Sequence, residues 1–136
     1  MKALVIYRFA AVALVLFAIA HTFGFNQFEP SWHQDPLIAA MRSQEFDMMG
    51  SRRVLWDLYV ALGYSLGAFY LFAAVLAWQL GGLSASARAD LRVVRWAFAI
   101  CFAVIAIVSF GFLFAIPLAF SALITISLAA GAASTR

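Results

Sequence analysis

Residues 96–135 read WAFAICFAVIAIVSFGFLFAIPLAFSALITISLAAGAAST and contain no charged residue. A helix that crosses the hydrocarbon core of a bilayer needs about 20 apolar residues, so this stretch is too long for one span. It divides at GFLFAIP, where Pro117 can open a new helix because its fixed φ suits the first helical position. We therefore predict two membrane spans here, at about 93–114 and 117–134, joined by a tight apolar turn.

The composition of the whole chain agrees with a membrane protein. Hydrophobic residues make up 66% of its 136 residues, and its mean hydropathy is +0.98. A soluble domain of this size keeps much of its surface in water and cannot bury so large an apolar fraction. The length predicts one domain, residues 1–136. The net charge of +3 follows membrane topology rather than forming a patch for nucleic acid, so we expect no nucleic-acid partner.

Two more apolar segments complete the predicted fold. The first covers about residues 5–24, and the second runs from about 54 to 80. The predicted fold class is therefore all-α, a membrane-embedded four-helix bundle. Small and hydroxyl-bearing residues in these spans predict close helix packing and hydrogen bonds across helices. These packing residues are Gly63 and Gly67, which form a GxxxG motif, and Ser121 and Thr125 in the last span.

Basic residues predict the orientation of the spans, because cytoplasmic loops carry an excess of Lys and Arg. Six of the nine basic residues fall on one side: Lys2, Arg8, Arg88, Arg92, Arg95 and Arg136. We therefore predict a multi-pass protein of the cell inner membrane with both termini in the cytoplasm. The loop between the first two spans then faces outward.

The start of the chain also fits a second interpretation. MKALVIYR, then FAAVALVLF, then AIA has the order of a signal peptide with an A-x-A cleavage site. Cleavage after Ala20 would leave His21 at a new amino terminus, where an imidazole can bind copper. We favour a retained membrane anchor.

The outer loop is predicted to contain a short amphipathic helix that lies on the membrane surface. Asp35 and Pro36 form a helix start, with Asp as the cap and Pro at the first helical position. Gly50 is predicted to end this segment and Ser51 to cap the second span. The first turn of that span would then hold arginines, although the helix dipole favours anions there. Pairing with acids or an anionic ligand would stabilise them.

Polar residues near the outer ends of the first two spans form the candidate binding site. His21 and Asp57 are each predicted about one turn inside the outer interface, and Tyr64 follows Asp57 by seven residues on the same helix face. Ionisable groups inside a membrane usually face a partner or a cavity. A purely structural role is the alternative for this pair. The predicted ligand-binding residues are His21, Asp57, Tyr64, Arg52, Arg53, Glu45 and Asp47.

The sequence predicts no metal and no cofactor. His21 and His33 are the two histidines, and they form neither an i, i+4 pair nor an HExxH motif. A haem would need a second histidine at the depth of His21. The lone Cys101 excludes a disulfide within the chain and a multi-cysteine metal site.

The chain resembles a family of small bacterial four-helix membrane proteins. The resemblance rests on AHTFGF (20–25), AAMRSQEFDMMGSRRVLWDLY (39–59) and LFAAVLAWQLG (71–81). It implies the four-helix fold and a bacterial inner membrane, without implying an activity. The first span is also similar, more loosely, to DoxX-like membrane proteins.

Three functional hypotheses follow. In the first, the outer end binds a lipid-like or quinone-like molecule, or docks a membrane partner, with Arg52 and Arg53 contacting phosphate or carboxylate. In the second, the protein is a structural subunit of a membrane complex or a homo-oligomer, assembled through the GxxxG stripe. In the third, His21 and Asp57 are an acid–base pair of an enzyme that modifies a lipid or isoprenoid, with Tyr64 as proton donor.

Overall fold

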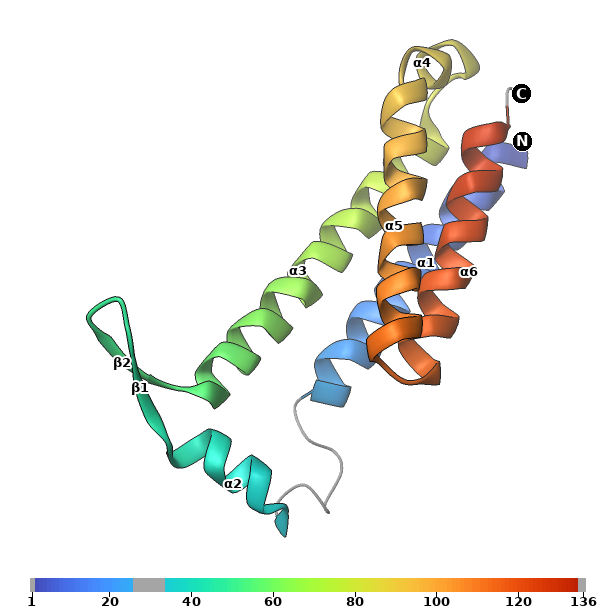
Figure 1. The fold of residues 1–136 in the computed structure, drawn as a ribbon. Helices are drawn as coiled ribbons and strands as arrows, with labels where there is room; N and C mark the ends of the chain where they lie inside the picture. Colours follow the sequence, from blue (N-terminus) through green and yellow to red (C-terminus); the bar gives the residue numbers. More distant parts are fainter. Residues whose placement is uncertain (1, 26–33, 135–136) are drawn as a thin grey trace. The chain divides into compact units, whose positions relative to one another are not determined.

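The computed structural model describes residues 2–25 and 34–134. In these residues, six helices and two short strands follow one another (Figure 1). In order, they are α1 (Lys2–Phe25), α2 (Pro36–Ser43), β1 (Glu45–Met48), β2 (Ser51–Val54), α3 (Leu55–Gly82), α4 (Ala85–Asp90), α5 (Arg92–Phe112) and α6 (Ala115–Ala133).

Four of these helices, α1, α3, α5 and α6, are long and apolar enough to cross a membrane. Their bounds lie within three residues of the predicted spans. The all-α fold class, with four spans and a short helix between the first two, is thereby confirmed. The last span begins at Ala115, so Pro117 lies in the first turn of α6 rather than at its first position.

The chain forms two compact units. Unit 1 contains residues up to Phe17 and from Tyr70 onward, and unit 2 contains Ala18–Phe69. The long helices α1 and α3 therefore each contribute one part to unit 1 and another part to unit 2.

The core of unit 1 lies where its four long helices meet. Phe17 of α1 stacks on Tyr70 of α3, with ring centroids 4.5 Å apart, and on Phe120 of α6, at 5.0 Å. Tyr70 also packs against Phe102 of α5, at 6.2 Å. Aromatic pairs at these separations add to the energy of burial, so these four rings bind all four helices into one bundle.

The outward faces of this bundle are apolar as well. Large side chains of α5 such as Val104, Ile107 and Phe110 are exposed. A soluble protein rarely leaves so much contiguous apolar surface in contact with water. These faces therefore suit the hydrocarbon of a bilayer.

In unit 2, α2 begins as the sequence predicts. The Asp35 side chain accepts a hydrogen bond from the Leu37 N–H at 2.8 Å, and Pro36 is the first helical residue. Because the first amides of a helix lack intrahelical partners, this cap stabilises a helix of only eight residues.

The segment after α2 differs from the prediction, because β1 and β2 form an antiparallel hairpin. Met49 and Gly50 have φ values of +52° and +86°, as in a type I′ turn, whose twist matches that of the strands. The Asp47 carboxylate accepts a hydrogen bond from the Gly50 N–H at 2.9 Å and stabilises this turn. Gly50 is thus a turn residue, Ser51 belongs to β2, and α3 begins only at Leu55.

Candidate anion-binding site

His21 and Asp57, the central pair of the predicted outer site, each bond to the backbone. The His21 Nε2 lies 3.2 Å from the Gly63 carbonyl oxygen, which accepts its hydrogen bond. The Asp57 carboxylate accepts from the Val54 N–H at 3.3 Å. This reach from the third helical residue to the cap residue is the carboxylate half of a capping box. Asp57 therefore stabilises the start of α3.

The contact with Gly63 also determines the depth of the histidine. Gly63 lies six residues beyond Asp57, which is about 9 Å along a helix axis. His21 therefore packs deeper along α3 than Asp57, whereas the sequence suggested equal depth. The two residues make no hydrogen bond to each other in the part of the chain that the structure describes. Tyr64, next to Gly63, is exposed on the surface of unit 2.

The GxxxG residues of α3 are buried against α1 within the same chain. Gly63 accepts the hydrogen bond of His21, and a Cβ added at Gly67 would lie 3.0 Å from the Thr22 hydroxyl oxygen. Small residues allow two membrane helices to approach this closely. This stripe is therefore occupied by the chain's own first helix, which weakens the hypothesis that it docks another subunit.

The predicted packing hydroxyls of α6 bond to their own helix. Ser121, fully buried, donates to the Pro117 carbonyl at 2.7 Å, and Thr125 donates to the Ser121 carbonyl at 2.7 Å. Both bonds reach back four residues, a local pattern that often bends helices slightly. These hydroxyls therefore provide small packing surfaces rather than the predicted bonds across helices.

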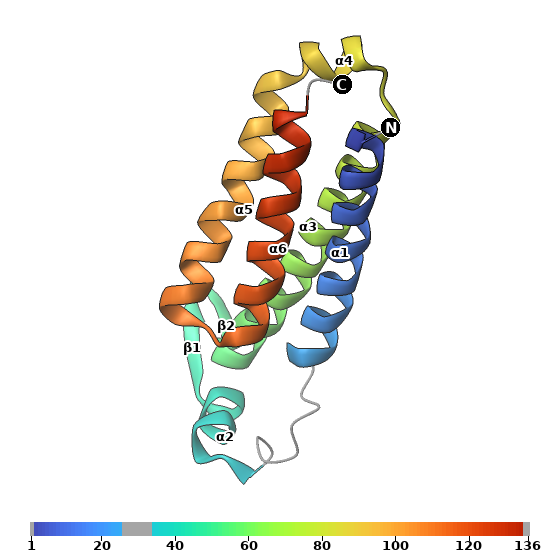
Figure 2. The ribbon, with the colours of Figure 1, turned by 90° about the vertical axis from the view of Figure 1, so that its right-hand side faces the viewer.

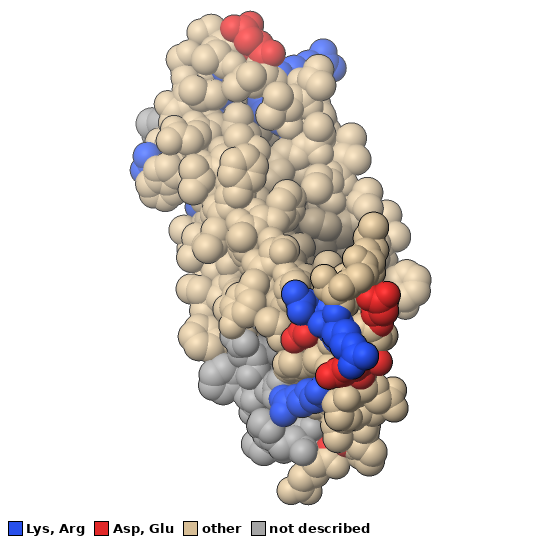
Figure 3. All heavy atoms as spheres, turned by 90° about the vertical axis from the view of Figure 1, so that its left-hand side faces the viewer, with Lys and Arg blue, Asp and Glu red and all other residues tan. Residues whose placement is uncertain are grey.

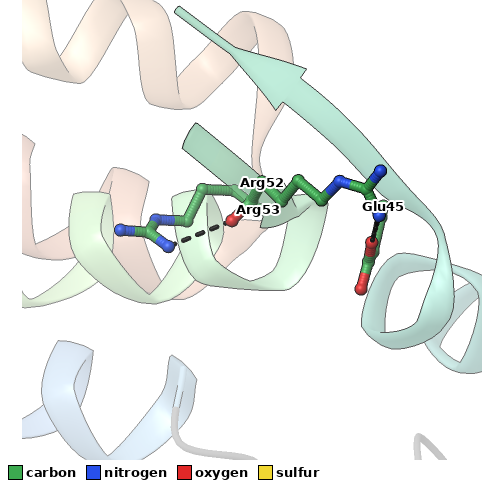
Figure 4. A network of polar contacts seen from close by, with 3 residues as sticks. All are labelled: Glu45, Arg52 and Arg53. Atoms are coloured by element: carbon green, nitrogen blue, oxygen red, sulfur yellow. Dashed lines mark hydrogen bonds and ion pairs between the residues drawn. The ribbon is translucent and has the colours of Figure 1, made fainter. Parts of the chain in front are cut away.

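Arg52 and Arg53 lie on β2, the second strand of the hairpin, and their side chains diverge (Figure 4). Arg52 pairs with Glu45 at 3.4 Å, which agrees with the expectation that acids stabilise these arginines. Arg53 extends in the opposite direction and donates to the Arg52 carbonyl at 3.0 Å. Asp47, opposite Arg52 in the register, is engaged by the turn. Figure 3 shows acidic and basic side chains side by side on this hairpin, so the local charges largely compensate one another.

A second group of arginines lies together in unit 1. The sequence analysis used these arginines only to predict the membrane orientation. Arg95, the fourth residue of α5, is 4% exposed. Its Nε donates to the Tyr7 hydroxyl at 3.2 Å, and its Nη1 donates to the Arg88 carbonyl at 2.8 Å. Its Nη2 donates to the carbonyls of residues 131, 132 and 134 at 2.9, 2.5 and 2.9 Å. We call this set of contacts the Arg95 network.

The Arg95 network is a cap for the C-terminus of α6. The last carbonyls of a helix have no intrahelical donors, and the negative end of the helix dipole attracts a cation. The guanidinium supplies both the donors and the charge. Gly131 contributes by its lack of a side chain, because a Cβ there would lie 2.8 Å from Cζ of the fully buried Tyr7 ring. The network thus joins α1, α5 and α6.

A cavity of about 390 Å³ opens beside this network. Small residues from α4 and α6 leave the space, and α5 supplies two arginines and an indole. The lining residues are Ala85, Ala89, Arg92, Arg95, Trp96, Ala132, Ala133 and Ser134. Arg92 is exposed, and Trp96 follows it by one helical turn on the same face.

Among the described residues, no carboxylate lies within 4.0 Å of the arginines at this end of unit 1. Within the described ranges 2–25 and 34–134, Arg52 and Glu45 form the only ion pair within 4.0 Å. Arg88, Arg92 and Arg95 therefore have no carboxylate partner in these ranges. Arg88 is itself buried and donates to the Leu83 carbonyl. Of these three cations, Arg92 and Arg95 line the cavity, and their positive potential can attract an anion.

The spacing of these arginines in the sequence gives information that is not used when basic residues are only counted to predict the membrane orientation. Positions 92 and 95 are three residues apart on α5 and therefore share one helix face, whereas Arg88 lies on the preceding helix, α4. The burial of Arg95 could not be predicted, because it depends on carbonyls at the far end of the chain. Sequence reasoning therefore found these arginines but missed the site.

Metal ligands do not gather anywhere in the described ranges, where no three His, Cys, Asp or Glu side chains are grouped. His33 and Arg136, used in the sequence analysis, lie outside the described residues. Comparison with protein-family models, with curated proteins and with solved structures gave no match to this chain.

Proposed function

We propose that this chain is a small multi-pass protein of the bacterial inner membrane that binds the anionic headgroup of a lipid-like molecule. The ligand would occupy the cavity beside the Arg95 network. The observation that carries the proposal is the presence of Arg92 and Arg95 at one cavity, without a carboxylate partner in the described ranges.

The orientation in this proposal follows from the charges of unit 1. The start of α1 and the end of α6 lie at the same end of this unit as α4 (Figure 2). Lys2, Arg8 and the arginines of α4 and α5 are near this end. An excess of basic residues favours the cytoplasmic side, so both termini and the cavity would face the cytoplasm.

The two arginines would have different roles. The Arg95 guanidinium already donates hydrogen bonds to backbone carbonyls, so it would contribute mainly its positive charge to the binding of an anion. Arg92 is exposed and can form a two-pronged hydrogen bond with a phosphate or carboxylate. Trp96 supplies an amphipathic ring suited to the depth of lipid headgroups. Basic pockets between membrane helices on the cytoplasmic side are known to bind anionic headgroups.

The ligand that the sequence predicted at the outer end is the alternative. In unit 2, the arginines diverge, and Arg52 already has an acid partner. The Arg53 guanidinium donates to the Arg52 backbone carbonyl, and Arg53 is the residue that this alternative would use.

Native mass spectrometry of the full-length protein, released from detergent, tests the two positions. The probes are phosphatidylglycerol, phosphatidylcholine with the same chains, and inorganic phosphate. We expect preferential binding of phosphatidylglycerol, because one Lys or Arg near the surface contributes about 1 kcal/mol toward anionic lipid. Arg92→Gln should weaken this binding about five-fold, since 1.4 kcal/mol corresponds to a factor of ten.

Arg53→Gln is the matched control, since it removes one exposed arginine from the other unit. Loss of phosphatidylglycerol with Arg53→Gln and not with Arg92→Gln would transfer the site to the outer end. Equal binding of both lipids by the unaltered protein would exclude an anionic headgroup site. Displacement by inorganic phosphate at millimolar concentration would identify a site for free phosphate instead of lipid.

A further inference from the structure

A second depression lies on another face of unit 1, between α1 and α3. It has a volume of about 420 Å³, and its surface is almost wholly apolar. Ala11 and Ala74 are buried and form its floor, whereas larger side chains form exposed walls. The wall residues are Val12, Val15, Leu16, Leu71, Val75 and Trp78. Alanines beneath larger walls produce a groove along the seam of the two helices.

One end of this groove carries a cation. The Arg8 guanidinium lies over the Trp78 ring, with its Cζ 4.3 Å from the ring centroid. Arg8 precedes Val12 by four residues, so both lie on the same face of α1, one turn apart. Arg8 is exposed and makes no ion pair in the described ranges. The groove thus begins at a cation and continues as an apolar channel.

The length of the groove matches one leaflet of a bilayer. Residues 8 to 16 of α1 span about 12 Å along the helix axis. Half the hydrocarbon thickness of a bilayer is about 15 Å. Arg8 is the seventh residue of α1, about 9 Å along the helix axis from its start. In the proposed orientation, the apolar part of the groove therefore extends from the cytoplasmic side toward the middle of the membrane.

We infer that this groove binds one phospholipid with an anionic headgroup, with its phosphate at Arg8 and an acyl chain along α1 and α3. Charge complementarity at Arg8 selects this occupant. A partner helix is a poorer fit, because close helix packing in membranes uses small residues on the contacting surface, whereas branched and aromatic side chains form these walls. The inference is independent of the headgroup site at Arg92.

The test counts bound lipids in the full-length protein by native mass spectrometry, with phosphatidylglycerol and phosphatidylcholine as probes. Val12→Trp fills the groove, and we expect it to remove one bound phosphatidylglycerol. Val104→Trp is the matched control, because Val12 and Val104 are 52% and 53% exposed and the latter lies on α5, outside the groove. We expect this control to retain the lipid.

Arg8→Gln is a second variant that leaves the groove open. It should weaken phosphatidylglycerol binding about five-fold, as expected for the loss of one interfacial cation, and phosphatidylcholine binding less, because the choline cation leaves that headgroup without net charge. Arg92→Gln, measured in parallel, should leave this lipid in place, so failure at one site is distinguishable from failure at the other.

Three outcomes would overturn the inference. The first is equal retention of phosphatidylglycerol by Val12→Trp and Val104→Trp at matched thermal unfolding midpoints. The second is an Arg8→Gln variant with unaltered lipid preference. The third is a dimer mass that Val12→Trp abolishes, which would make a second copy of the chain the occupant.

Discussion

The Arg95 network and the hairpin hold arginines in opposite ways. Arg95 is 4% exposed and bonds to neutral oxygens of one hydroxyl and four backbone carbonyls. The Arg52 side chain is 87% exposed and meets one carboxylate at 3.4 Å. An exposed pair is screened by water and typically contributes at most about 1 kcal/mol. Arg95, which has no acid partner among the described residues, is thus expected to matter more for stability than Arg52.

The two arginines differ in how much their contacts are expected to contribute to the free energy of unfolding. At the hairpin, both charges stay hydrated whether or not they meet, so their pairing changes little. At the Arg95 network, several carbonyls at the end of α6 would lose their donors together. Unsatisfied buried polar groups cost about 1–3 kcal/mol each, so the effect accumulates.

Replacement of Arg95 should have the largest effect. We expect Arg95→Met to lower the free energy of unfolding by about 3 kcal/mol or more, because at least two carbonyls of α6 lose donors. Arg95→Lys should recover part of the loss, since an ammonium retains the charge but not the planar fork. Thermal unfolding in detergent and titration with a denaturing detergent measure the difference.

Arg92→Met is the control for that prediction, because Arg92 is exposed on the same helix. Exposed substitutions away from special features usually change stability by less than about 0.5 kcal/mol. Equal destabilisation by Arg95→Met and Arg92→Met would show that burial of the guanidinium does not determine its contribution.

Replacement of Gly131 should have an intermediate effect. In Gly131→Ala, the new Cβ would lie 2.8–3.0 Å from three atoms of the Tyr7 ring, and overpacking of this kind costs about 1–3 kcal/mol. Gly111→Ala is the control, since no atom lies within 4 Å of a Cβ there. Unfolding midpoints of the two variants should differ, with Gly111→Ala at or slightly above the unaltered protein because alanine favours helices. Identical midpoints would contradict the close fit of Tyr7 against α6.

The hairpin ion pair should have the smallest effect. A double-mutant cycle of Arg52→Ala and Glu45→Ala should give a coupling energy below about 1 kcal/mol. Raising the ionic strength from about 0.01 M to 1 M shortens the screening length from about 30 Å to 3 Å and should abolish this coupling. A coupling that survives high salt would mean that this pair is protected from water, which would remove the contrast with Arg95.

Much of the fold could be predicted because its signals are local. The charge-free stretch 96–135 indicates two spans, and Asp35 followed by Pro36 marks the start of α2. The hairpin escaped prediction because its turn has Met49 at a position with positive φ, where Asn, Asp or Gly is the usual signal. The role of Asp57 as a cap depended on the same error, since it requires α3 to begin at Leu55.

By itself, the amino-acid sequence determined how many helices are apolar enough to cross a membrane and where they begin and end, because hydropathy and capping depend on neighbours along the chain. Only the tertiary structure decided that Arg95 is buried, since its acceptors are supplied by residues 36 to 39 positions further along. It likewise decided that Gly63 bonds to His21 across 42 positions. Contacts of such long range depend on which helix faces meet, and residue spacing within one helix does not specify them.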